Sequence, residues 1–155
     1  MSDNVKNESK AEAKAETKAS DNFSVFVDSE ELIDISIKCY KKDGTLIVEG
    51  DDKFDSSKTD SKEFHFWFRR PCQGDVALIH DMLKAYKNNI DLNSNDFGSE
   101  YFYVFAMEYC RFCVLIRKWD LGVPTTKANL DRLDPKMVKA VNAKLRDIIA
   151  MDGII

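Results

Sequence analysis

Apolar and polar residues alternate along the first hydrophobic part of the chain, and this period of two predicts a strand with one buried face. The apolar positions of the alternation are Ile33, Ile35, Ile37 and Cys39. Asp43-Gly44 follows, and this pair is the strongest short signal for a hairpin turn. Residues 45–49 (TLIVE) then have the composition of a returning strand. Together these residues predict a β-hairpin.

Residues 63–69 (EFHFWFR) are a second predicted strand, and aromatic side chains occur at both its even-numbered and its odd-numbered positions. The phenylalanines would share one face of a strand, while His65 and Trp67 would share the other. A strand with aromatic residues on both faces is expected to lie centrally in a small sheet or to be covered on both sides.

Three later segments have the periodicity of helices. The first is predicted to begin at Asp75 as its N-cap, and its apolar stripe consists of Val76, Ile79, Met82, Leu83 and Tyr86. The second, about residues 99–119, is apolar on nearly every side, which is typical of a central helix. The third begins at Asp134-Pro135 and can end at Gly153. Its apolar face consists of Met137, Val138, Val141, Leu145, Ile148 and Ile149.

Residues 117–137 (RKWDLGVPTTKANLDRLDPKM) connect the second of these helices to the third, and we interpret them as a structural brace. Trp119 would anchor the connector, with its indole N–H hydrogen-bonded at the edge of the core. Pro124 would turn the chain, and Thr125 or Thr126 would cap a short helical turn. The other brace residues are Leu130 and Leu133, which would return to the core, and Pro135 at the helix start.

The order of these segments predicts one folded unit with a tail. Residues 1–22 are dominated by Ala, Lys, Glu and Ser and contain no aromatic residue, so we expect a disordered charged tail. Residues 50–62 are polar and are expected to form a flexible loop. Residues 23–155 would form a single α+β domain. In it, a small antiparallel sheet, made of the N-terminal hairpin and strand 63–69, packs on three or four C-terminal α-helices.

Charge and apolar runs narrow the classes of function. With 23 basic and 27 acidic residues, the formal net charge is −4, which argues against a general binder of DNA or RNA. Residues 1–22 contain no apolar segment like that of a secretion signal, so we expect the four cysteines to be reduced thiols. The longest apolar run, residues 101–116, contains Glu108 and Arg111 and is too short for a confident membrane span. We therefore expect protein partners and no membrane segment.

The sequence contains no recognisable catalytic or metal-binding motif. Cys110 and Cys113 have CxxC spacing, but they lie inside an apolar helix without a second pair of ligands. Core packing is the better interpretation of both. The chain has no phosphate-binding loop and no nucleophile motif. We therefore expect a non-enzymatic protein without metal or cofactor.

Arg69 and Arg70 follow the aromatic strand and allow two interpretations. Two guanidinium groups at a strand end could hold a phosphate or a partner's carboxylate. They could equally pair with Asp75 and Asp81 at the joint between strand and helix. We favour the second, structural interpretation.

The connector resembles the C-terminal segment of the tailed-bacteriophage tail assembly chaperones. The matching order is Trp119-Asp120, Pro124-Thr125, Asn129-Leu130, Leu133 and Asp134-Pro135, followed by an amphipathic helix. Upstream, residues 66–71 (FWFRRP) followed by a helix are similar to the aromatic–Arg–Pro entry of such proteins. The resemblance covers about residues 63–150.

The resemblance implies a non-enzymatic protein that binds the tape-measure protein, the tail-tube protein or both while a virion tail is assembled in the host cytoplasm. The residues expected to contact the partner are His65, Trp67, Arg69, Arg70, Met82 and Tyr86. Two alternatives remain open. One is a structural virion component of the neck, tail or baseplate. The other is a small phage-encoded regulatory binding protein that contacts nucleic acid through Arg69 and Arg70.

Overall fold

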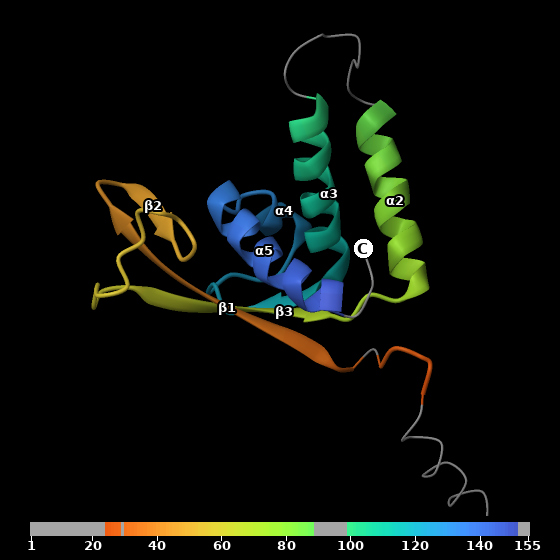
Figure 1. Cartoon of the computed structure of the whole chain (residues 1–155), viewed down its shortest axis with the longest axis horizontal. Helices are drawn as coiled ribbons and strands as arrows, with labels where there is room; N and C mark the ends of the chain where they lie inside the picture. Colours follow the sequence, from red (N-terminus) through yellow and green to blue (C-terminus); the bar gives the residue numbers. More distant parts are fainter. Residues whose placement is uncertain (1–23, 29, 89–98, 152–155) are drawn as a thin grey trace, which may run out of the picture.

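A computed structural model describes residues 24–28, 30–88 and 99–151 (Figure 1). The expected tail, most of the polar stretch after residue 88, and Gly153 lie outside these ranges. The elements are β1 (Leu32–Lys42), β2 (Thr45–Val48), β3 (Lys62–Arg69), α2 (Gln73–Asn88), α3 (Ser99–Leu115), β4 (Ile116–Trp119), α4 (Lys127–Leu130) and α5 (Pro135–Met151).

The strands form a four-stranded antiparallel sheet in the order β2-β1-β3-β4. The hairpin predicted from Asp43-Gly44 is present, and both residues have positive φ, 53° and 76°. Positive φ at both central residues defines a type I′ turn, whose backbone twist matches that of the two antiparallel strands it joins. β3 lies centrally, paired with β1 on one side and β4 on the other.

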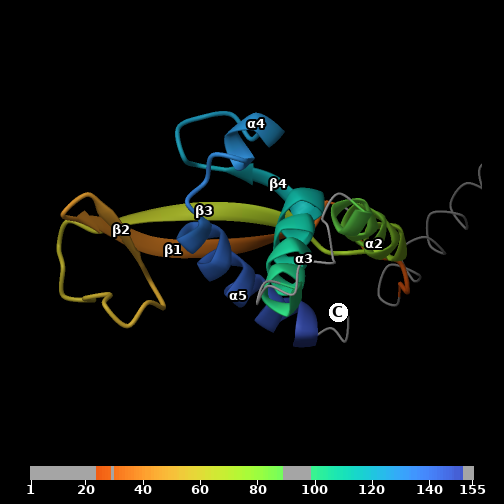
Figure 2. The same ribbon diagram turned by 90° about the horizontal axis from the view of Figure 1, so that it is seen from above.

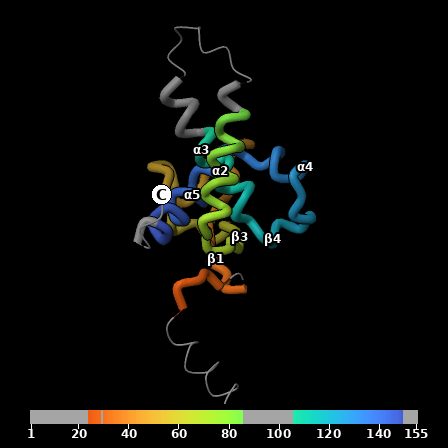
Figure 3. Tube along the Cα trace, turned by 90° about the vertical axis from the view of Figure 1, so that its right-hand side faces the viewer, coloured from red at the N-terminus to blue at the C-terminus, as the bar shows by residue number. Residues whose placement is uncertain are grey.

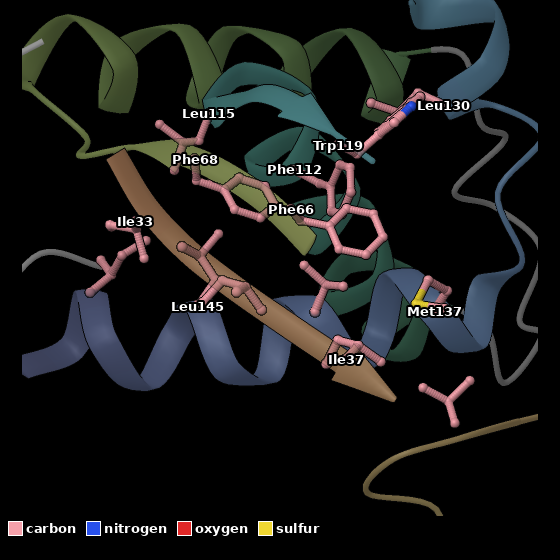
Figure 4. Packing of buried hydrophobic residues seen from close by; sticks show 14 of the residues in the cluster. Ile33, Ile37, Phe66, Phe68, Phe112, Leu115, Trp119, Leu130, Met137 and Leu145 are labelled. Atoms are coloured by element: carbon pink, nitrogen blue, oxygen red, sulfur yellow. The ribbon is translucent and has the colours of Figure 1, made fainter. Parts of the chain in front are cut away.

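Helices α2, α3 and α5 lie on one side of the sheet (Figure 1). α4 and α5 flank α3 on opposite sides (Figures 2 and 3). The alternating apolar residues of β1 and β3 point into the space beneath α3 and α5. Phe66 and Phe68 both meet the ring of Phe112 edge-on, with centroids 6.0 Å and 5.1 Å away (Figure 4). The fold is therefore the predicted small antiparallel sheet packed on helices.

The prediction of one helix over residues 99–119 is wrong at its C-terminal end. α3 ends at Leu115, and Ile116–Trp119 form β4, which pairs with β3. The extended backbone carries Trp119 over Phe66, with ring centroids 6.4 Å apart, and supplies β3 with its second neighbour. Because the apolar run continues through Leu115 to Ile116, the hydrophobic pattern does not reveal that the helix ends at Leu115.

The expectation that Asp75 caps the first helix from outside is also wrong. α2 begins at Gln73, so Asp75 lies within its first turn. Its Oδ2 accepts a hydrogen bond from the backbone N–H of Cys72 at 3.0 Å, and its own N–H donates to the carbonyl of Cys72 at 3.0 Å. This is the acidic half of a capping box, in which an acid inside the first turn reaches back to the residue before the helix.

Candidate functional site

The face of the sheet turned away from α3 and α5 is covered by none of the described helices (Figure 1). We call it the open face. Along each strand it receives the residues that alternate with the buried ones. They are Asp34, Ser36 and Lys38 of β1, Glu63, His65 and Trp67 of β3, and Lys118 of β4.

Strand register decides which of these residues are neighbours. Trp67 lies opposite Asp34 on one side and opposite Lys118 on the other, while His65 lies opposite Ser36. The register of β4 shifts between Trp67 and Phe68, so that Arg117 is an extra residue of a β-bulge. Bulges re-aim side chains at sheet edges, and here the bulge puts Lys118 next to Trp67.

His65 and Trp67 form the centre of the open face. Their rings stack with centroids 5.5 Å apart and planes 19° apart. The Nζ of Lys118 lies 4.8 Å from the centroid of the Trp67 ring, a cation–π distance. Trp67 is partly buried, so part of its ring remains accessible beside a positive charge.

The imidazole of His65 is held by acidic neighbours. Its Nδ1 lies 2.9 Å from Oδ1 of Asp34, and its backbone N–H donates to Oδ1 of Asp120 at 2.7 Å. The hydrogen bond to Asp34 is the main cause that raises the pKa of His65 above its ordinary value, and the charges of Asp34, Asp120 and Glu63 act in the same direction. Acidic solution therefore favours the charged form of this pair.

Three of the residues around His65 and Trp67 are not among those expected from the sequence: Asp34, Lys118 and Asp120. Each reaches the site from another strand or from the connector, at a sequence separation of up to 55 residues. The alternation within β1 indicates that Asp34 lies opposite the buried isoleucines, but not which residue of β3 it meets. The position of Lys118 beside Trp67 could not be predicted, because the sequence favoured a helix over this residue.

One end of the same sheet face is closed by the segment that follows β2. Tyr40, next in the alternation after Lys38, donates from its hydroxyl to the carbonyl of Lys53 at 3.1 Å and accepts from the N–H of Asp55 at 2.9 Å. The ring of Phe54 lies 5.4 Å from that of Tyr40. These contacts bury Tyr40 and limit the open face to the part around Trp67.

Arg69 and Arg70 lie in ion pairs at the joint between the sheet and α2. The guanidinium of Arg69 bonds the carboxylate of Asp75 and donates to the carbonyl of Val114 at 3.2 Å. The Nε of Arg70 lies 3.4 Å from Oε1 of Glu31. The geometry at Arg69 matches the structural alternative with Asp75 rather than Asp81.

Two of the expected partner contacts, Met82 and Tyr86, belong to α2. Met82 is half-buried on α2, on the side of the sheet opposite His65 and Trp67. Tyr86 belongs to α2 by its backbone, and its side chain is outside the described part of the structure. Of the expected contact residues whose side chains the structure describes, only His65 and Trp67 lie together on the open face.

The connector joins β4 to α5 through side-chain to backbone hydrogen bonds. The indole N–H of Trp119 donates to the carbonyl of Val123 at 2.7 Å, and its backbone N–H donates to Oγ1 of Thr125 at 3.2 Å. Thr126 is the N-cap of α4. The other brace residues are Pro124, which is exposed, Leu130, which is buried, Leu133, which is half-buried, and Pro135, which is the first residue of α5.

The cysteines are free thiols, and none of the described residues form a group of three metal-binding side chains. Cys110 is fully buried, and burial together with the nearby Cys113 raises its pKa to about 11. Such a thiol is protonated at neutral pH and is a poor nucleophile. The CxxC pair therefore contributes packing at the α3 side of the core.

A cavity of about 530 Å³ lies between α5 and the turn after β2. Three lysines line it together with acidic residues of the turn, and two of these lysines are already engaged. Lys136 donates to the carbonyl of Leu46 at 3.3 Å, and Lys144 donates to Ser36 O at 2.8 Å and to Glu49 at 3.1 Å. The cavity thus has a lining of mixed charge, and its lysines hold α5 against the sheet. The open face is therefore the stronger candidate for a binding site.

Comparisons of the chain with protein-family models, with curated proteins and with solved structures found no match. In the described ranges no helix has the length and apolar character needed to cross a bilayer. The open face and the resemblance found in the sequence are therefore the basis for assigning a function.

Proposed function

We propose that the chain is a non-enzymatic protein-binding module whose open face contacts its partner through Trp67. The observation that carries this proposal is a partly exposed tryptophan, stacked on His65, at the centre of a sheet face that no described helix covers. Tryptophan is among the residues that contribute most to binding at protein interfaces. We therefore expect a partner to contact the chain at this aromatic pair, on the sheet face without a covering helix.

The charges around Trp67 favour a protein partner over a nucleic acid. Asp34 and Glu63 are acidic, Lys38 and Lys118 are basic, and the four surround the aromatic pair. An aromatic centre with a polar rim of both signs is the usual composition of a protein–protein interface. A phosphate backbone would require a basic excess, and the guanidinium groups of Arg69 and Arg70 already have carboxylate partners.

The partner class comes from the resemblance to phage tail assembly chaperones. It favours the tape-measure protein or the tail-tube protein, bound in the host cytoplasm before the tail is complete. In this proposal the open face covers an apolar helical segment of the partner until that segment is packed. The chain would then leave the particle, unlike a structural component of the neck, tail or baseplate.

Co-expression with a tape-measure protein and, separately, with a tail-tube protein tests the proposal. We expect one of them to co-purify and to become more soluble, and we expect Trp67→Ala to abolish both effects. Leu78→Ala is the matched control, because Leu78 is an exposed apolar residue on α2, 48% accessible. Failure of both pairs to form, or equal loss in the two variants, would overturn the proposal.

Tryptophan fluorescence gives a second readout without mutation. Trp119 is buried and Trp67 is partly exposed, so acrylamide should quench Trp67 much more strongly. We expect the quenching to fall when the partner binds. Mass spectrometry of purified virions then separates a transient chaperone from a structural component. A gel shift with nucleic acid that is lost in Arg69→Ala/Arg70→Ala would instead support the regulatory alternative.

A further inference from the structure

The outer edge of β1 is largely unpaired. β1 pairs with β3 from Leu32 to Cys39, but β2 pairs only with residues 39–42. Ser36 O accepts from Lys144, and Lys38 O accepts from the N–H of Glu49, which shows that the even-numbered residues direct their backbone groups outward. The N–H and C=O of Asp34 therefore point to a side where no described strand lies. Such an edge is a template for another strand.

α5 lies beside this edge. Because the Nζ of Lys144 reaches Ser36 O, the Lys144 side of α5 faces the outer edge of β1. Ile148 follows one turn later on the same side of the helix and is half-buried. A strand added to β1 would find Ile148 and the aliphatic stem of Lys144 on the helix-covered side. Strand addition at a sheet edge is a recurring mode of peptide recognition.

An apolar segment of the chain lies just before β1 without a place in the sheet. Val25 and Phe26 are 82% and 85% exposed, and Val27 is 39% exposed. The N–H of Phe26 bonds only locally, to Oγ of Ser24 at 3.2 Å. Figure 1 shows the segment continuing beyond the beginning of β1, away from the sheet. Valine and phenylalanine favour strands, so this exposed segment has the composition of an edge strand.

We propose that residues 24–28 of a second copy add to the outer edge of β1, and that the exchange is reciprocal. In the register that fits, Val25 lies opposite Ile35 and Val27 opposite Ile33. Both valines then share the helix-covered face with the isoleucines, as the side-chain alternation requires. Phe26 lies opposite Asp34, and its backbone N–H and C=O bond the outward C=O and N–H of Asp34. The product is a two-fold symmetric dimer. Its valines lie on the helix-covered side of the sheet, while Phe26 lies beside Asp34 on the open face, at the border of the partner site proposed above.

A second copy fits better than the same chain folding back. A tight reversal at residues 28–31 would pair Val27 with Leu32, which puts both valines on the open face beside Asp34. Glu31 is also held toward β3 by Arg70, which keeps the segment directed past the start of β1. For the same chain to place Val27 opposite Ile33, residues 28–32 would have to form the turn, although Leu32 of β1 is paired with Arg69. A segment from a second copy reaches this register without a turn.

The charges near the two-fold axis make the dimer sensitive to salt. Asp28, Glu30 and Glu31 of both copies come close to the axis, and the Arg70 of each copy compensates only part of this charge. Like charges repel less when salt screens them. Raising the ionic strength from about 0.05 M to about 0.5 M should therefore strengthen the dimer. A complex held by ion pairs would respond in the opposite direction.

Sedimentation equilibrium of the full chain tests the dimer. We expect the wild type to dimerise and Val25→Asp/Val27→Asp to weaken the dimer by about a hundredfold, about tenfold for each buried valine. Val123→Asp is the matched control, because Val123 is 49% exposed in the connector, and it should dimerise like the wild type. Circular dichroism verifies that each variant is folded. A wild type that stays monomeric, or a double variant that still dimerises, would overturn the proposal.

Cysteine cross-linking tests the register. In a Cys72→Ser background, which removes the exposed thiol, Phe26→Cys with Asp34→Cys should form a disulfide-linked dimer, because directly opposed residues are close enough for a disulfide. Phe26→Cys with Lys38→Cys should not, since Lys38 lies four residues further along β1. A disulfide within one chain would show that the segment folds back on its own strand and would refute the second copy.

Discussion

His65 combines three contacts that come from different parts of the chain. Its ring stacks on Trp67, its Nδ1 faces Asp34, and its backbone N–H is bonded by Asp120. His65 therefore links β1 through its ring and the connector through its backbone N–H at one point of the open face. Because the ring is a third exposed, it can change its protonation state without unfolding.

Asp34→Asn is expected to lower the pKa of His65, measured by an NMR titration of its ring. The raised pKa means that the folded state holds the proton more tightly than the unfolded chain. The resulting stability is fully present below the unfolded value of about 6.5 and is lost as the pH rises through the higher folded pKa. The variant should show a smaller fall in stability over that window. An unchanged His65 pKa in the variant would exclude Asp34 as the cause.

The cysteines should react in an order that follows their exposure. Cys72 is exposed, whereas burial, together with the neighbouring Cys113, raises the pKa of Cys110 to about 11. At pH 8 we expect one fast reaction with a thiol reagent, which disappears in Cys72→Ser, and slow reaction of Cys110 only on unfolding. Fast labelling of Cys110 in the native protein, located by peptide mapping, would contradict its burial in the core.

At the scale of elements, the joints between them depend on polar contacts. Arg69 connects the end of β3 to the first turn of α2 through Asp75 and to the end of α3 through Val114 O. Asp75 is nearly inaccessible, with 6% of its side chain exposed. Arg69 therefore positions the start of α2 and the end of α3 relative to the sheet.

Arg69→Ala should destabilise the protein by about 2 to 3 kcal/mol, because it leaves the buried carboxylate of Asp75 without its cation. Arg70→Ala is the control. Its ion pair with Glu31 is largely exposed, and such pairs contribute about 0.5 kcal/mol. Urea unfolding followed by circular dichroism measures both. Equal effects of the two substitutions would argue against a special role of Arg69 at the joint.

Two glycines should respond oppositely to alanine. Gly44 has φ +76° in the hairpin turn, a conformation in which a Cβ costs about 1 kcal/mol. Gly74 lies in the first turn of α2, where an added Cβ would meet only Sγ of Cys72 at 3.8 Å, so the helix propensity of alanine should add about 0.5 kcal/mol. The midpoint temperature of unfolding should therefore fall in Gly44→Ala and rise in Gly74→Ala. A stabilised Gly44→Ala would contradict the turn geometry.

At the scale of the whole molecule, the sheet separates a packed side from an uncovered one. The helix-covered side contains the core cluster, in which Phe66 and Phe68 are fully buried (Figure 4). The other side carries charged residues around the stacked pair His65 and Trp67. Neighbouring residues of β3 thus lie in different environments: one set is buried in the core, and the other lies on the open face.

Phe68→Ala and Trp67→Ala test this division at adjacent positions. Phe68 is fully buried against Phe112, and removing its ring should cost about 4 kcal/mol. That is a large part of the stability of a domain of this size. Trp67→Ala should cost about 1 kcal/mol, mainly the lost contacts with His65 and Lys118. A loss at Trp67 as large as at Phe68 would mean that the open face is part of the core.

Local patterns were enough to predict the hairpin, the central strand and the α+β class. Alternation in β1 and β3 reports which side chains are buried, and Asp43-Gly44 reports the turn, because both depend on residues adjacent in the chain. α5 follows for the same reason from Asp134-Pro135 and its apolar stripe. These features require no knowledge of which element packs against which.

The position of β4 and the composition of the open face depend on contacts between distant residues. In residues 101–119 nearly every position is apolar up to Ile116, so periodicity cannot separate helix from strand, and pairing with β3 sets the boundary at Leu115. Strand register then brings Asp34 and Lys118 to Trp67. Alternation assigns a side chain to one of two faces, whereas its neighbours on that face follow only from the pairing of strands.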